Sequence, residues 1–174
     1  MRLVGGVLVC CALLAFLFRQ LQPTMNSTAS MRAKVRKLLP TVEQLASRHK
    51  GQSGKVGVVG GSYEYTGAPY FAAMAALRVG ADLSHVFCLK DAAGAIKSYS
   101  GDLIVHPALS SEKGSAKASV EAVQKWFPAL QALVVGPGLG RDPEVLEAAR
   151  GIIRAAMSEE HNLWVVVDGD GLWR

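Results

Sequence analysis

Three short turns, rich in glycine and acids, are the parts of this sequence best suited to binding a phosphate or a nucleotide. They are Gly60-Gly61-Ser62, Gly136-Pro137-Gly138-Leu139-Gly140 and Asp168-Gly169-Asp170-Gly171. Glycine lets a ligand approach the backbone N–H groups and tolerates positive φ. A helix that begins behind such a turn adds partial positive charge for an anion. The turns therefore predict an anion or nucleotide site, provided that the fold brings them together.

Each turn follows a run of apolar residues that reads as a β-strand. Strands are predicted at residues 56–59, 83–89, 103–105, 132–135 and 164–167. The runs "VGVV", "ALVV" and "WVVV" are continuous rather than alternating, which is typical of strands buried on both faces of a parallel sheet. Ligands of open parallel sheets bind at the carboxyl ends of the strands, where the three turns lie.

Helices are predicted between these strands, at residues 69–79, 115–127 and from Asp142 to about Met157. The last begins with a capping Asp142, a proline at the first helical position and Glu144 in the first turn. Alternating strands and helices predict an α/β fold, a doubly wound and mostly parallel sheet with helices on both faces.

The glycine spacing excludes the two commonest nucleotide-binding loops. "GVVGGS" lacks the G-x-G-x-x-G pattern, and "GPGLGRD" carries Arg141 where the final glycine would fall. No G-K-[ST] closes either loop, so a Walker A motif is also absent. A tight strand-to-helix turn without any ligand is the alternative interpretation of "GPGLG". The combination of two glycine turns and an acidic strand end favours a binding site.

Other polar residues give weaker signals. Asp168 and Asp170 end an apolar strand, where an acid either faces a site or costs stability. His106, before Pro107, is interpreted as a turn residue at a strand end. Cys88 is interpreted as a buried thiol rather than a nucleophile, because His85 would point to the opposite face of the same strand. His49 and His161 are interpreted as surface residues, and no metal or Ser-His-Asp spacing is found.

Charge and hydropathy set the first 40 residues apart as a targeting leader and linker. Residues 1–55 carry nine Lys or Arg against one acid, a balance of +8, whereas residues 56–174 carry ten against thirteen, a balance of −3. The basic charge therefore belongs to the leader and gives no argument for nucleic-acid binding. The lack of acids before Glu43 and the basic residues suit a mitochondrial presequence. The alternatives are a secretory signal or marginal membrane anchor, which the apolar run at residues 3–18 suits, and a cytosolic form that starts at Met25 or Met31.

Three motifs in order resemble the ATP-dependent NAD(P)H-hydrate dehydratase family, over roughly residues 42–173. They are "HKGQSGKVGVVGGSYEYTGAPYFAAMAALRVGADLSHVF", "ALVVGPGLGRD" and "VVVDGDGLW". The resemblance implies a ribokinase-like fold for residues 41–174. It also implies repair of the S epimers of NADHX and NADPHX, the hydrated forms of NADH and NADPH. The family uses ATP with Mg²⁺, releases ADP and phosphate, and works beside an epimerase.

The resemblance also implies which residues bind. Gly138 is expected to contact the hydrated dinucleotide, with Gly136 and Gly140 as neighbours. The helix-opening turn is expected to line the same pocket; its residues are Tyr65, Thr66, Gly67 and Ala68. Asp168 matches the acid at the strand end in the family and is expected near the phosphate or metal.

Two departures from the family qualify these expectations. The family reads D-A-D-G-L-W where this sequence has "DGDGLW", a change between small residues. The motifs for ATP and for the catalytic acid are expected beyond Arg174, so the sequence corresponds to the N-terminal half of the fold. The alternatives are therefore a non-catalytic form that binds nucleotide or the full-length protein, and an unrelated ribokinase-like kinase. Homo-oligomer formation is left open.

Overall fold

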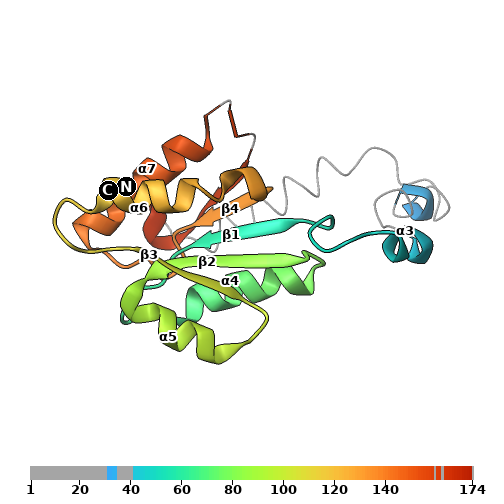
Figure 1. Cartoon of the computed structure of the whole chain (residues 1–174), viewed down its shortest axis with the longest axis horizontal. Coiled ribbons are helices and arrows are strands. Elements are labelled where there is room, and N and C mark those ends of the chain that lie inside the picture. Colours follow the sequence, from blue (N-terminus) through green and yellow to red (C-terminus); the bar gives the residue numbers. More distant parts are fainter. Residues whose placement is uncertain (1–30, 35–40, 159, 162, 174) are drawn as a thin grey trace, which may run out of the picture. The chain divides into compact units, whose positions relative to one another are not determined.

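The structure is a computed structural model that describes residues 31–34, 41–158, 160–161 and 163–173 (Figure 1). The chain divides into two compact units, Met1–Ser47 and Arg48–Arg174. The apolar run at residues 3–18, and with it most of the predicted leader, lies outside the described residues. Within the described ranges, no helix is long and apolar enough to cross a membrane.

The described part of the first unit is helical. Residues 31–34 form a helical turn and α3 spans Val42–Ala46. Thr41 and Gln44 form a reciprocal cap at the start of α3: the Gln44 N–H donates to Thr41 Oγ1 at 3.2 Å, and the Thr41 N–H donates to Gln44 Oε1 at 2.9 Å. This capping box satisfies two N–H groups that a short helix would otherwise leave free.

The second unit is built on a five-stranded parallel sheet. Its strands are β1 (Lys55–Val59), β2 (Leu83–Leu89), β3 (Ile104–Leu109), β4 (Ala132–Val135) and β5 (Trp164–Val167), in the spatial order β3-β2-β1-β4-β5. The chain therefore proceeds from β1 toward one edge and then returns to add β4 and β5 on the other side. The reversal places a topological switch point between β1 and β4, where open α/β sheets bind ligands.

Helices cover both faces of this sheet (Figure 1). On one face lie α4 (Gly67–Arg78) and α5 (Lys90–Tyr99). On the other lie α6 (Ala116–Gln124), the 3-10 turn η1 (Phe127–Ala129) and α7 (Pro143–Ala156), and a second 3-10 turn, η2 (Gly169–Leu172), follows β5. This arrangement follows from right-handed crossovers on either side of the switch point. It confirms the predicted α/β sheet with helices on both faces.

Two differences from the prediction have local causes. Helix α5 was not predicted, because it follows β2 directly, contains Gly94 and buries mostly small residues. Strand β3 does not end at Val105 but continues through Pro107, which a strand at the edge of a sheet tolerates because an outward N–H is not needed there. The interpretation of His106 as a turn residue was therefore wrong: it lies inside β3.

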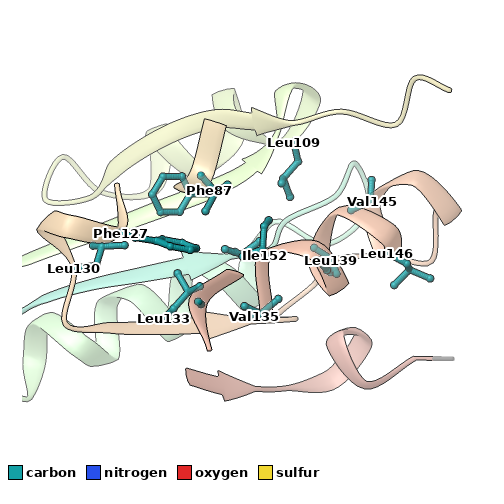
Figure 2. Close-up of a cluster of buried hydrophobic side chains, with 14 residues drawn as sticks. Phe87, Leu109, Phe127, Leu130, Leu133, Val135, Leu139, Val145, Leu146 and Ile152 are labelled. Atoms are coloured by element: carbon teal, nitrogen blue, oxygen red, sulfur yellow. The ribbon is translucent and has the colours of Figure 1, made fainter. Parts of the chain in front are cut away.

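The apolar core is divided by the sheet into two clusters. The larger lies between the sheet and the α6/α7 layer and includes Phe87, Phe127, Leu133 and Ile152 (Figure 2). The smaller lies under α4 and α5 and includes Cys88, as predicted for a buried thiol. Burial raises the pKa of this thiol to about 11, so it is not a nucleophile at neutral pH.

Helix α7 shows how sequence and packing agree. The Asp142 carboxylate accepts hydrogen bonds from the N–H groups of Glu144 at 2.9 Å and Val145 at 3.2 Å, which makes it the predicted N-cap. Such a cap contributes about 1 kcal/mol. The residues facing the core follow the helical period and are Val145, Leu146, Ala148, Ala149, Ile152 and Ala156. The amphipathic pattern alone therefore fixes which face of α7 packs on the sheet.

A histidine pair joins β2 to β3 beneath Trp126. His85 Nδ1 lies 3.0 Å from His106 Nε2, the two rings are parallel, and the His106 ring lies 4.4 Å from the Trp126 ring. One ring must donate and the other accept, so the contact requires that at least one of them is neutral. Burial lowers the pKa of both rings, and nearby positive charge adds to the effect: His106 and Lys55 at His85, Lys97 at His106.

This pair predicts a fold that weakens in mild acid. Below the ordinary histidine pKa of 6.5, the unfolded chain binds protons that the folded chain resists, so stability is complete above that pH and falls below it. We expect the free energy of unfolding, measured with urea, to be lower at about pH 5.5 than at about pH 7.5. His106→Gln keeps a hydrogen-bonding side chain without the titration and should flatten this dependence. The exposed His49→Gln is the matched control; an equal effect of both variants would contradict the assignment.

Candidate functional site

The three predicted turns meet at the carboxyl ends of β1, β4 and β5. The Gly61 N–H donates to the Gly138 carbonyl at 3.1 Å, which joins the first turn to the second. The Gly140 N–H donates to Asp170 Oδ2 at 3.1 Å, which joins the second to the third. We call the resulting surface the glycine edge, defined as residues 60–62, 136–140 and 168–171. The sequence prediction that these turns share one edge of the sheet is confirmed.

The turns pack too closely for side chains at two of the glycines. A Cβ on Gly60 would collide with the Pro137 carbonyl, and a Cβ on Gly136 would collide with the Asp168 carbonyl. Gly136 also has a φ of +128°. These glycines are therefore required by contact between the turns, in addition to any approach of a ligand.

Gly138 packs against the turn that opens α4. Its φ is +59°, and a Cβ there would lie 2.7 Å from the Tyr65 carbonyl oxygen and 2.9 Å from Tyr65 Cβ. This contact places the turn of Tyr65, Thr66, Gly67 and Ala68 beside the "GPGLG" turn. The Tyr65 side chain is 57% exposed. Thr66 Oγ1 lies 2.7 Å from the Tyr99 hydroxyl of α5, so a hydrogen bond anchors this turn from behind.

The two acids of the third turn differ in their surroundings. The Asp170 carboxylate is half-buried and accepts from Gly140, so it holds the second and third turns together. The side chain of Asp168 is exposed, while its backbone supports the turn: its N–H donates to the Val135 carbonyl and its carbonyl accepts from Gly171, both at 2.9 Å. Among the described residues, the exposed Asp168 carboxylate has no hydrogen-bond partner, whereas the Asp170 carboxylate bonds within the fold.

Sequence reasoning gave no role to the side chains of Arg141 and Ser62, which both contribute to this edge. The Arg141 guanidinium lies 3.9 Å from the centre of the Trp173 ring, a cation–π contact between the second and third turns. The Ser62 hydroxyl is buried beside Gly140 without a hydrogen-bond partner among the described residues. Both residues flank the glycine motifs in sequence, so their position next to "GG" and "GLG" was the available signal.

No group of three His, Cys, Asp or Glu side chains within the described ranges is arranged to hold a metal ion. A hollow of about 480 Å³ lies at the amino ends of β2 and β3, away from the glycine edge, and is lined by Lys50, Arg78 and Asp82 among others. Asp82 has a structural role there, because its carboxylate accepts from the N–H groups of Gly51 and Ser53, both at 2.8 Å. Hydrogen bonding to the backbone lowers the pKa of Asp82.

Comparison with known proteins agrees with this geometry. The carbohydrate-kinase family model described as NAD(P)H-hydrate dehydratase matches residues 56–174. The chain belongs to the NAD(P)H-hydrate dehydratase family. Within the family it is 51% identical to the ATP-dependent (S)-NAD(P)H-hydrate dehydratase of Rattus norvegicus over 168 residues, which cover 94% of this chain and 46% of the rat protein. The chain therefore spans less than half the length of this curated relative.

Solved structures show the same fold. A ribokinase-like superfamily protein from Enterococcus faecalis superposes with a TM-score of 0.58 at 20% identity, covering 72% of this chain and 40% of that protein. An ADP/ATP-dependent NAD(P)H-hydrate dehydratase from Bacillus subtilis, co-crystallised with ATP/Mg²⁺, superposes with a TM-score of 0.53 at 21% identity, covering 77% and 43%. The ribokinase-like fold predicted from the motifs is thus confirmed for the part of that fold that this chain covers.

The contact between Gly138 and Tyr65 predicts a stability effect at the centre of the glycine edge. In Gly138→Ala the alanine must adopt a left-handed backbone conformation, which costs about 1–2 kcal/mol. Its Cβ must also displace the Tyr65 turn. We expect a urea midpoint clearly below that of the unchanged chain. Gly94→Ala is the matched control, because Gly94 lies in α5 with ordinary φ and open space around it. That variant should be neutral or slightly stabilising. Equal stability of both variants would show that Gly138 is not constrained in this way.

Proposed function

We propose that this chain supplies the substrate side of an ATP-dependent NAD(P)H-hydrate dehydratase. The reaction is the dehydration of the S epimers of NADHX and NADPHX, which restores NADH and NADPH and releases ADP and phosphate. The observation that carries the proposal is the glycine edge: three turns, predicted from their glycines and acids at strand ends, are hydrogen-bonded into one surface at the switch point of the sheet. The identity to a rat protein of that name supports the choice of substrate.

The dinucleotide would bind across Gly136, Gly138 and Gly140, with residues 65–68 along one side. Backbone without side chains lets the ligand come close, and the exposed Tyr65 ring offers a flat apolar surface for a nicotinamide ring. The first N–H groups of α4 begin at Gly67 and favour negative charge. Arg141 adds a guanidinium suited to a phosphate.

ATP with Mg²⁺ is proposed as the cosubstrate, because the Bacillus subtilis relative was co-crystallised with both. The described residues form no metal site of their own, so a magnesium ion would arrive on the nucleotide phosphates, with the exposed Asp168 as a single carboxylate beside it. ATP supplies the phosphoryl group that turns the hydroxyl of the hydrated ring into a leaving group. The residues of this chain would hold the ring in place for that step. The acid expected to act as base lies outside the motifs that this chain contains.

A second candidate is a non-catalytic form that binds the nucleotide or the full-length protein. This candidate requires only the binding surface of the glycine edge. The chain spans 46% of the rat relative and 38% of the human one. An epimerase that interconverts the R and S hydrates is the expected pathway partner of either form.

Binding and turnover of NADHX distinguish the two candidates. With ATP and Mg²⁺, NADH formation is followed by its absorbance at stoichiometric chain, with the full-length rat enzyme as a positive control. We expect calorimetry to detect NADHX binding by residues 1–174. We expect their turnover to be orders of magnitude slower than that of the control, because the motif expected to carry the base is not within these residues. Turnover equal to the control would contradict the missing-base argument. No binding would contradict the proposed function itself.

Two variants test the binding surface. Gly138→Val places a β-branched side chain at the centre of the glycine edge and is expected to abolish NADHX binding. Because it also strains the fold, Tyr65→Ala provides an independent test: the side chain is exposed, so the chain should fold normally while its affinity for NADHX falls. Gly94→Ala, on α5, is the control for both. Unchanged affinity in Tyr65→Ala and in Gly138→Val would remove these residues from the site.

We propose a mitochondrial destination, on the basis of the basic leader without acids before Glu43. A fluorescent protein fused after residue 174 should enter mitochondria when translation starts at Met1. A start at Met31 removes the apolar run and should leave the fusion in the cytosol. The leader contains a glycosylation sequon, Asn26-Ser27-Thr28. Reticular staining and glycosylation at Asn26 would instead identify the leader as a secretory signal.

A further inference from the structure

The hollow of about 480 Å³ opens where β2 and β3 begin, at the opposite end of the sheet from the glycine edge. Three stretches of the second unit line it: the loop that holds Lys50, the end of α4 with the start of β2, and the turn before β3. Small-molecule sites occupy about 300–1,000 Å³ and combine an apolar lining with a few polar groups. The hollow has that size, and the nucleotide proposed for the glycine edge does not use it.

The floor of the hollow is apolar. Four half-buried side chains from α4, β2 and β3 form it: Met74, Leu77, Leu83 and Ile104. Met74 and Leu77 also pack against the core cluster under α4 and α5, so the floor continues the core. A ligand that covers this floor gains about 25 cal/mol for each Å² of apolar surface removed from water. The flexible methionine can adapt to the shape of an apolar group.

Four charged side chains form the rim, two cations and two acids with a balance of zero: Lys50, Arg78, Asp82 and Asp102. Neither cation forms an ion pair in the part of the chain that the structure describes. The exposed Asp102 carboxylate accepts from the Ser100 hydroxyl at 3.3 Å, and the Asp102 N–H donates to the same hydroxyl at 3.1 Å, so a tight turn holds this acid. Both signs of charge are therefore available to a ligand.

Asp82, the other acid, holds one side of the rim in place. Its carboxylate accepts from the N–H groups of Gly51 and Ser53, both at 2.8 Å, which fixes the loop next to Lys50. The Asp82 N–H donates to the Gly54 carbonyl at 2.9 Å and ties the same loop to the start of β2. A rim that is fixed before the ligand arrives loses less conformational entropy on binding.

The balance of charge on the rim selects the class of ligand. A phosphate dianion would meet two cations but also two acids, and an amine alone would meet the same opposition with the signs reversed. A molecule with one charge of each sign can pair with both kinds of group at once. An apolar body on that molecule would cover the floor. An amino acid with a large apolar side chain meets all three requirements.

We propose that the hollow binds a free amino acid with a large apolar side chain. Arg78 would bind the carboxylate through two parallel hydrogen bonds, with Lys50 adding positive charge beside it. Asp102 would accept hydrogen bonds from the ammonium group, and the side chain would cover the floor. The site is separate from the glycine edge, so the inference does not rest on the proposed function.

Gly101 offers a way to fill the hollow without disturbing the fold. It lines the hollow, and a Cβ at this position would meet no atom within 4 Å. Its φ lies outside the left-handed region, so other residues can adopt this backbone. Leucine there should take up space that the ligand needs. Gly94 of α5 has the same freedom but does not line the hollow, which makes it the matched control position.

Calorimetry on residues 1–174 near neutral pH tests the inference with L-phenylalanine. We expect a saturable isotherm with one ligand per chain. N-acetyl-L-phenylalanine lacks the ammonium group and L-phenylalanine amide lacks the carboxylate. Each should bind at least about tenfold more weakly, because it leaves one kind of charge on the rim unpaired. Free glycine, which has no apolar side chain, should also bind at least about tenfold more weakly.

Two variants locate the ligand. Arg78→Gln removes the partner of the carboxylate and Gly101→Leu fills the hollow, so each should weaken the binding of L-phenylalanine at least about tenfold. Lys125→Gln is the control for charge, since Lys125 is exposed at the end of α6 on the opposite face of the sheet. Gly94→Leu is the control for volume. The urea midpoints of all four variants should stay close to that of the unchanged chain, which separates loss of binding from loss of fold.

Several results would overturn the proposal. Absence of binding by both L-phenylalanine and L-leucine at millimolar concentration would exclude an amino acid as the ligand. Unchanged affinity in Gly101→Leu would place the ligand outside the hollow, and this variant decides if Arg78→Gln does not fold. Affinity that falls only in Tyr65→Ala would place the ligand at the glycine edge. Adenosine monophosphate that binds more tightly than L-phenylalanine, and is lost in Gly101→Leu, would identify a nucleotide and contradict the charge argument.

Discussion

The hydrogen bond between the Gly61 N–H and the Gly138 carbonyl connects the two strand ends between which the chain reverses direction. All other contacts of the glycine edge depend on how closely β1 and β4 approach there. Gly60 must lack a side chain to pass the Pro137 carbonyl, and Gly136 must lack one to pass the Asp168 carbonyl. The parallel sheet aligns the carboxyl ends of the three strands. The glycines allow the turns at these ends to contact one another and form one continuous backbone surface. A side chain at either position would push the neighbouring turn away.

Most of the sheet could be predicted from the sequence, because buried parallel strands have a recognisable apolar pattern. Continuous runs such as "ALVV" and "WVVV" need burial on both faces, and the predicted bounds of β2, β4 and β5 agree with the structure. Helix α5 escaped prediction because its buried face is built from Ala92, Ala93 and Ile96, a signal weaker than that of large apolar residues. The contact of His106 with His85 and Trp126 depends on the register of β3 against β2, which no local pattern encodes.

The site was predicted at the level of motifs and less well at the level of single side chains. The resemblance pointed to Asp168, and its side chain is exposed at the edge. Asp170 has the same chemistry two residues away, yet it is bound to the Gly140 N–H. The sequence alone does not indicate which of the two acids forms a structural hydrogen bond and which is exposed to a ligand. The difference arises from the 3-10 turn of residues 169–172, which directs Asp170 back toward the second turn.

Helix α4 links the glycine edge to the core of the sheet. It begins at Gly67, where the Tyr65 turn rests on Gly138. Its buried residues are Pro69 and Ala73, and Ala73 belongs to the same apolar cluster as Val58 of β1. The packing of α4 on the sheet therefore fixes the position of the Tyr65 turn, so the hydrophobic core and the substrate side of the proposed site depend on the same contacts.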